Sequence, residues 1–236
     1  MFGTDHDNPT MTAGNSTPLT DGAAVVLLAS EEWAEARGLD FLARLTAYET
    51  AAVDYVDGDE GLLMAPARAV PRMLERTGLG MEDFDLVEIH EAFASQVLAT
   101  LAAWEEQGLA PVDRAKLNVT GSSLATGHPF VATGARIVAT LAKLLAERDG
   151  PGRGLISICA AGGQGVTAIP ERPQGRGARP GGGRQPRLSR HSRRTSSTSY
   201  GLRPSGGPGG GIRSILVIFS LISVTIRRTA VSEGAR

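Results

Sequence analysis

Three short polar segments carry the side chains that could do chemistry in this chain. His90 and Glu91 directly follow an apolar run, and His128 lies in a Gly-His-Pro-Phe sequence. Cys159 ends a second apolar run. A histidine near a thiol can hold or remove its proton, so these segments predict an acid–base site if the fold brings them together.

The residues after Cys159 are small, with the sequence Ala-Ala-Gly-Gly-Gln-Gly at 160–165. Small residues leave backbone amides accessible, and such amides stabilise the negative oxygen of an enolate or a tetrahedral intermediate. A phosphate-binding loop would precede a helix, whereas this turn lies between two apolar runs. The turn therefore favours an oxyanion-binding role over phosphate binding.

Each segment also has a purely structural interpretation, which the residue pattern alone leaves open. Cys159 could be a small buried apolar residue. His90 and Glu91 could be the polar start of a helix, whose dipole favours a carboxylate in the first turn. His128 could be a loop residue held extended by the proline that follows it, and the glycines after Cys159 could serve only a tight hairpin.

Strand and helix patterns alternate along the chain, which predicts an α/β domain with a mixed sheet and helices packed on it. Its polar segments then fall at strand ends, where sites in such sheets usually lie. The predicted strands are 23–29, 41–48, 84–89, 117–119, 154–159 and 166–169. The predicted helices are 31–37, 66–77, 91–107 and 133–148, the first capped by Ser30 and stopped by Gly38.

The charge changes sharply near residue 170. Residues 1–170 hold 11 Lys and Arg against 23 Asp and Glu, whereas 171–236 hold 13 Arg, 2 Glu and 12 Gly. Such an asymmetry indicates a boundary. We expect a loop at 1–22, the folded domain at 23–172 and a basic, disordered Gly/Arg/Ser/Pro-rich tail at 173–236.

The single cysteine argues against an intrachain disulfide and a cysteine-cluster metal site, and favours a reducing, cytoplasmic setting. No signal peptide is visible. The apolar stretch 214–226 is shorter than the about 20 residues of a membrane span. No metal site, membrane span or nucleic-acid partner is expected, although a basic arm that binds nucleic acid or an acidic membrane surface is the alternative interpretation of the tail.

Four segments, in the same order, resemble the C-terminal domain of thiolases. They are 12–24, the His-Glu-Ala-Phe run at 90–93, the Gly-His-Pro-Phe-Val-Ala-Thr-Gly-Ala-Arg run at 127–136, and the Cys-Ala-Ala-Gly-Gly-Gln-Gly run at 159–165. Histidine at position 90, Phe130 and the Cys-Ala-Ala-Gly-Gly sequence are similar to the β-subunit of the fatty-acid oxidation complex. The resemblance implies a thiolase-like fold and 3-ketoacyl-CoA thiolysis, or the reverse Claisen condensation, in β-oxidation.

The resemblance also implies roles for individual residues. His128 would activate a nucleophilic cysteine and help bind a thioester oxygen, and Cys159 would be the general acid/base at the acetyl carbon. His90 would contribute to an oxyanion hole, and Glu91 would support the site. Ala161, Gly162, Phe130 and Asn15 would lie at the substrate. Coenzyme A and acyl-CoA are implied as substrates, with no bound cofactor.

The sequence departs from the thiolase pattern in two places. Family members have two similar halves, and the half with the nucleophilic cysteine has no counterpart here. Residues 173–236 have the composition that a shifted reading frame in GC-rich DNA can produce. We therefore expect a partner, either a thiolase N-terminal half or a homo- or hetero-oligomer. The alternatives are a non-catalytic remnant that binds thiolase-like partners, or a cysteine–histidine hydrolase built from Cys159 and His128 alone.

Overall fold

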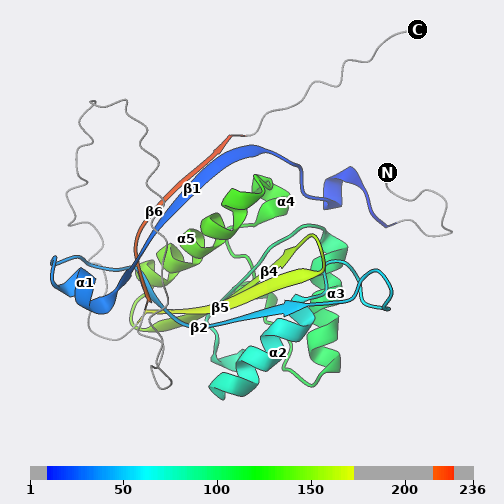
Figure 1. The fold of residues 1–236 in the computed structure, drawn as a ribbon, viewed down its shortest axis with the longest axis horizontal. Helices are drawn as coiled ribbons and strands as arrows, with labels where there is room; N and C mark the ends of the chain where they lie inside the picture. Colours follow the sequence, from blue (N-terminus) through cyan, green and yellow to red (C-terminus); the bar gives the residue numbers. More distant parts are fainter. Residues whose placement is uncertain (1–9, 173–214, 226–236) are drawn as a thin grey trace, which may run out of the picture.

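The computed structural model (Figure 1) describes residues 10–172 and the backbone of 215–225. Within these residues the chain forms a mixed sheet of six strands in the order β1-β6-β2-β5-β4-β3. β3 and β4 run parallel, and the other neighbours are antiparallel. The strands are β1 (Asp21–Ser30), β2 (Ala43–Ala52), β3 (Leu86–Ile89), β4 (Gly152–Ala160), β5 (Gln164–Arg172) and β6 (Ile215–Thr225). The predicted α/β class with a mixed sheet is confirmed.

Helices cover both faces of the sheet, with α2 and α3 on one face and α5 on the other (Figure 1). Side chains of a strand point alternately to the two faces. Leu155 of β4 accordingly packs with α2 and α3, and Ile156 packs with α5. The helices are α1 (Glu31–Glu35), α2 (Pro66–Thr77), α3 (Ala94–Glu106), α4 (Ser123–Thr126) and α5 (Val131–Glu147), with 3-10 turns η1 (Ala13–Asn15), η2 (Met81–Asp83) and η3 (Arg114–Lys116).

α2 begins and ends at the residues that the sequence predicts. Pro66 occupies the start, where its missing amide proton leaves no donor unpaired, and Gly78 ends the helix with a left-handed φ of 69°. Trp104 of α3 is 1% exposed, and its indole Nε1 donates to the carbonyl of Pro66 at 3.1 Å. This bond fixes α3 against the start of α2.

β4 and α5 approach each other closely at Gly154. An added Cβ at this position would lie between 2.6 and 2.9 Å from the Leu141 side chain, so only glycine allows this separation. Leu141 is itself fully buried in the cluster that α5 forms with the sheet. The helix that follows the predicted histidine loop is therefore held firmly against the strand that ends in Cys159.

Two predicted elements differ from the structure. The predicted helix 91–107 begins only at Ala94, because Phe93 is extended and forms an isolated bridge with Ser16. The predicted strand 117–119 is a single bridge between Leu117 and Val87. It extends no further because Asn118 has a positive φ of 46°, which turns the chain out of the strand direction.

Part of the segment predicted as a disordered tail is a strand. Residues 215–225 form β6, which pairs with β1 along its whole length and with β2 over three residues. The sequence Ile-Leu-Val-Ile-Phe has the β-propensity and lack of charge that allow it to fill this place between two strands. The rest of 173–236 lies outside the described residues. Among the helices described here, none has the length and apolar character needed to cross a membrane.

Candidate active site

His90 directly follows β3, at the carboxyl end of the parallel strand pair. Its backbone amide donates to the carbonyl of Ser157 at 2.9 Å, which continues the β3–β4 ladder by one residue. The side chain is 3% exposed, and Nδ1 lies 2.8 Å from the hydroxyl of Ser123 in α4. His90 is therefore fixed by a hydrogen bond of its backbone and by another of its ring.

His128 lies in the short loop between α4 and α5, and its ring packs against that of His90. The two ring centroids are 4.5 Å apart, and the ring planes are inclined by 43°. Nδ1 of His128 lies 2.7 Å from the hydroxyl of Thr133, in the first turn of α5. The structure therefore brings together two histidines that are far apart in the sequence.

The segment before β1 joins the two histidine loops. The Thr17 amide donates to the carbonyl of Ala92 at 3.0 Å, and its hydroxyl donates to the carbonyl of Ser123 at 2.7 Å. The amide of His128 donates to the carbonyl of Pro18 at 2.9 Å. This part of the predicted loop 1–22 is thus a component of the site scaffold.

Glu91 connects three loops rather than starting a helix. Its Oε1 accepts a hydrogen bond from Asn118 Nδ2 at 2.7 Å, and its Oε2 accepts one from the amide of Leu124 at 3.0 Å. Asn118 in turn accepts from the amide of Ile89 at 2.8 Å. The interpretation of Glu91 as a polar helix start is wrong, and the carboxylate braces the loop that carries His90.

A buried charged group lies behind the two imidazoles. Arg136 of α5 is 4% exposed, and its guanidinium NH2 group donates to the hydroxyl of Ser123 at 3.0 Å and, more weakly, to that of Ser122 at 3.4 Å. Glu88 of β3 is 1% exposed, and neither carboxylate oxygen has a hydrogen-bond partner among the described residues. The charges of Glu88 and Arg136 act on each other across this interior.

Burial dominates the electrostatics of the site. It lowers the pKa of His90 to about 4, with His128 and Arg136 acting in the same direction. It also lowers the pKa of His128, again with help from Arg136. Burial raises the pKa of Glu88 to about 7, although Arg136 opposes this rise. At neutral pH both imidazoles are therefore uncharged, as a general base and a hydrogen-bond donor require.

Cys159 lies near the end of β4, two residues beyond the point at which His90 continues the ladder. It is 4% exposed and pairs with Gly165 of β5. Burial raises the pKa of its thiol to about 12, so the thiol holds its proton at neutral pH. The structure thus places the thiol at the same end of the sheet as His90, and in the described residues no side-chain hydrogen bond links it to either imidazole.

The four residues predicted to bind substrate lie in different surroundings. The Phe130 side chain is 63% exposed, and its ring centroid is 5.0 Å from that of His128. Ala161 and Gly162 are exposed in the β4–β5 turn, where Gly162 has a φ of 92°. The side-chain oxygen of Asn15 accepts from the amide of Thr12, and its side-chain nitrogen donates to the carbonyl of Thr10. Phe130 is therefore next to the histidine pair, whereas the Asn15 side chain is occupied locally.

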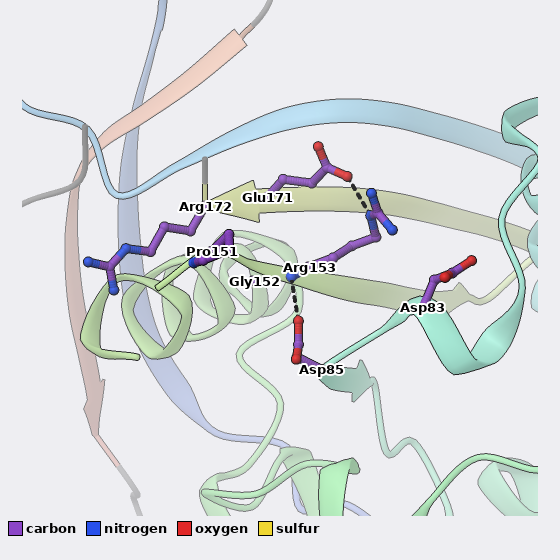
Figure 2. A pocket seen from close by; sticks show the side chains of 7 residues that line it. All are labelled: Asp83, Asp85, Pro151, Gly152, Arg153, Glu171 and Arg172. Atoms are coloured by element: carbon purple, nitrogen blue, oxygen red, sulfur yellow. Dashed lines mark hydrogen bonds and ion pairs between the residues drawn. The ribbon is translucent and has the colours of Figure 1, made fainter. Parts of the chain in front are cut away.

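The hollow in Figure 2 is separate from these residues. It has a volume of about 330 Å³ and lies at the amino end of β4 and the carboxyl end of β5, opposite the end that carries Cys159. Among its charged groups, Arg153 and Glu171 form an ion pair, and Asp85 accepts a hydrogen bond from the backbone amide of Arg153 at 2.9 Å. Across the described ranges, no cluster of His, Cys, Asp or Glu could hold a metal ion.

Sequence reasoning assigned no role to five groups around the histidines, namely Glu88, Asn118, Ser123, Thr133 and Arg136. For Glu88 and Arg136 the sequence did contain a signal, namely a charged residue within an apolar pattern. Glu88 is the one acidic residue of β3, and Arg136 lies on the buried face of α5. Such residues are rarely fully buried without a role or a partner.

The comparisons with known proteins agree with this fold. Residues 39–172 match the family described as "Thiolase, C-terminal domain", and the chain belongs to the thiolase family. The resemblance seen in the sequence is therefore confirmed. The match begins just before β2 and ends with β5, so it includes both histidines and Cys159.

Several relatives are similar over the same part of their chains. A 3-ketoacyl-CoA thiolase of Shewanella sediminis is 42% identical over 178 residues, which cover 71% of this chain and 40% of the relative. The crystal structure of the Bacillus anthracis acetyl-CoA acetyltransferase has a TM-score of 0.61 at 41% identity, covering 70% of this chain and 39% of that one. The dimeric peroxisomal thiolase of Saccharomyces cerevisiae has a TM-score of 0.60 at 38% identity, with 71% and 39% covered. The chain thus spans about 40% of the length of the curated relatives it matches.

Proposed function

We propose that this chain takes part in acyl transfer between a 3-ketoacyl-CoA and coenzyme A, in the cytoplasm and in fatty-acid β-oxidation. The observation that carries the proposal is the pair of uncharged imidazoles, His90 buried and His128 half-buried, at the sheet end that also holds Cys159, in a chain of the thiolase family. The names of the relatives, 3-ketoacyl-CoA thiolase and acetyl-CoA acetyltransferase, support this substrate class. Coenzyme A and acyl-CoA are substrates in this proposal, which assigns no resident cofactor.

In the cleavage direction, the thiolate of a nucleophilic cysteine attacks the 3-keto carbon, and the bond from this carbon to its neighbour breaks. The electron pair forms the enolate of acetyl-CoA, which takes a proton from Cys159, while the acyl group stays on the nucleophile as a thioester. Coenzyme A then gives its thiol proton to the Cys159 thiolate and displaces the acyl group. His128 would take the proton of the nucleophile at the start and return it at the end.

The electrostatics support this division of roles. An imidazole acts as a base only when uncharged, and burial lowers the pKa of His128. Burial raises the pKa of Cys159 to about 12, which makes its thiol a proton donor and a poor nucleophile at neutral pH. The same value argues against a hydrolase in which Cys159 is the nucleophile. His90 would donate a hydrogen bond to the substrate oxygen.

In this proposal the nucleophilic cysteine lies outside this sequence, whose single cysteine is Cys159. A thiolase N-terminal half, or a second thiolase-like subunit, would supply it. β1 exposes Val25, Leu27 and Leu28 at 55%, 40% and 50%, which is apolar surface that such a partner could cover. This exposed strand also supports the alternative that the chain associates with thiolase-like partners without turnover.

Reconstitution separates the two possibilities. The N-terminal half of the Shewanella sediminis relative would be expressed as a separate polypeptide and mixed with this chain, acetoacetyl-CoA and coenzyme A. We expect formation of acetyl-CoA with both polypeptides present, and none with either polypeptide alone or with a Cys159→Ala variant. Association of the two polypeptides without acetyl-CoA formation would favour the non-catalytic alternative and defeat the proposed activity.

A further inference from the structure

The buried arginine behind the histidine pair determines how the neighbouring hydroxyl can bond. A guanidinium group only donates hydrogen bonds. The Arg136 NH2 group lies 3.0 Å from the Ser123 oxygen, so this oxygen is the acceptor. Ser123 has no solvent exposure, and its hydroxyl proton must therefore find an acceptor within the protein.

Nδ1 of His90 is the acceptor that the structure offers to this proton. It lies 2.8 Å from the Ser123 oxygen, and the described residues give the hydroxyl no other acceptor. In the opposite tautomer, Nδ1 would donate to Ser123, and the hydroxyl proton would be buried without a partner. Arg136 thereby selects one of the two neutral forms of the imidazole.

We propose that Arg136, acting through Ser123, is a positioning residue that fixes the tautomer of His90, with Nδ1 as an acceptor and the proton on Nε2. Its use in catalysis rests on the proposed function, since the proton on Nε2 would then be the one offered to the substrate oxygen. The tautomer itself is a property of the folded chain and needs no substrate.

Nearby carboxylates favour the cationic form of Arg136 when they are ionised. The carboxyl group of Glu88 lies on β3, two residues before His90, and it attracts Arg136 from the sheet side, as does Glu91. Arg136 packs on the buried face of α5, whose first turn contains Thr133, the partner of His128. α5 thus gives His128 a direct partner, Thr133, whereas Arg136 reaches His90 only through Ser123. Unlike the Thr133 hydroxyl, the guanidinium cannot accept a hydrogen bond.

The test is the long-range proton–nitrogen spectrum of the full chain labelled with 15N-histidine, recorded at pH 7 without substrate. The chain has four histidines, and the signals of His90 are those missing from a His90→Gln variant. We expect the nitrogen shift of a non-protonated nitrogen at Nδ1 and that of a protonated nitrogen at Nε2. A protonated Nδ1 overturns the proposal, whether or not reconstitution yields turnover.

Two serine variants provide a matched comparison. Ser122 and Ser123 are both fully buried and both lie near Arg136, but only Ser123 contacts His90. Ser123→Ala should turn the single tautomer into a mixture of both, whereas Ser122→Ala should leave the His90 nitrogen shifts in place. If the two variants have the same His90 nitrogen shifts, Arg136 does not act on His90 through Ser123. If a variant does not fold, the wild-type spectrum decides the question.

Discussion

A buried base, His90, and a buried acid, Glu88, lie two residues apart, and both make the free energy of unfolding depend on pH. The pKa of His90 is lowered to about 4 from the usual 6.5, and that of Glu88 is raised to about 7 from the usual 4.5. Between these values the folded chain keeps His90 uncharged and Glu88 protonated, whereas the unfolded chain does the reverse. The variants His90→Gln and Glu88→Gln should therefore change the pH dependence in opposite directions.

The magnitudes follow from proton linkage. Between pH 4 and 6.5, the unfolded chain binds one more proton at residue 90, so His90 makes the free energy of unfolding rise by about 1.4 kcal/mol per pH unit. Between pH 4.5 and 7, the folded chain binds one more proton at residue 88, so Glu88 makes the free energy of unfolding fall by about the same amount per pH unit. The two contributions offset each other in the wild-type chain, and each is about 3 kcal/mol over its full window.

Urea unfolding at several pH values from 4.5 to 6.5 measures these slopes. Relative to wild type, the free energy of unfolding of His90→Gln should fall with rising pH, and that of Glu88→Gln should rise with it. Taking each variant against wild type removes the contribution of titrating groups that do not interact with the substituted residue. If the free energy of unfolding of both variants has the same pH dependence as that of wild type, the burial of these two groups is wrongly described.

Further predictions concern packing and reactivity. Gly154→Ala should lower the free energy of unfolding by about 1–3 kcal/mol in urea, because its Cβ would overlap Leu141, whereas Gly134→Ala in α5, whose nearest neighbour would be 3.9 Å away, should cause no loss. Cys159 should react with iodoacetamide at pH 8 far more slowly in the folded chain than in urea, and equal rates would contradict its burial. Asn118→Ala should lower the free energy of unfolding by about 1–3 kcal/mol, and with it the urea midpoint, since a Glu91 oxygen and the amide of Ile89 lose their partner. An unchanged midpoint would show that these bonds do not brace the loop.

Local signals predicted the elements that begin and end on special residues. α2 has proline at its start and glycine at its end, and α1 has Ser30 as its cap, whose hydroxyl accepts from the amide of Trp33. Their boundaries depend on backbone bonds within a few residues, which the sequence contains directly. The thiolase-like motifs likewise predicted that His90 and His128 belong to one site.

The remainder depends on contacts between distant parts of the chain. Glu91 has the pattern of a helix start, but its bonds to Asn118 and Leu124 and the extended backbone of Phe93 keep it out of α3. In the sequence Arg136 is one of several polar residues of α5, and its role follows only from the fold, which places Ser123 of α4 against it. β6 was missed for the same reason, because a strand in the middle of a sheet is defined by its neighbours β1 and β2.

The location of the acyl group during the reaction tests the central proposal most directly. The reconstituted pair of polypeptides would be mixed with acetoacetyl-CoA, quenched in acid and analysed by intact-mass spectrometry. We predict an acetyl group on the polypeptide with the nucleophilic cysteine and none on this chain, because the buried Cys159 thiol, with a pKa raised to about 12, exchanges only protons. An acetyl group on Cys159, or no acetyl group on either polypeptide, would contradict the proposed roles.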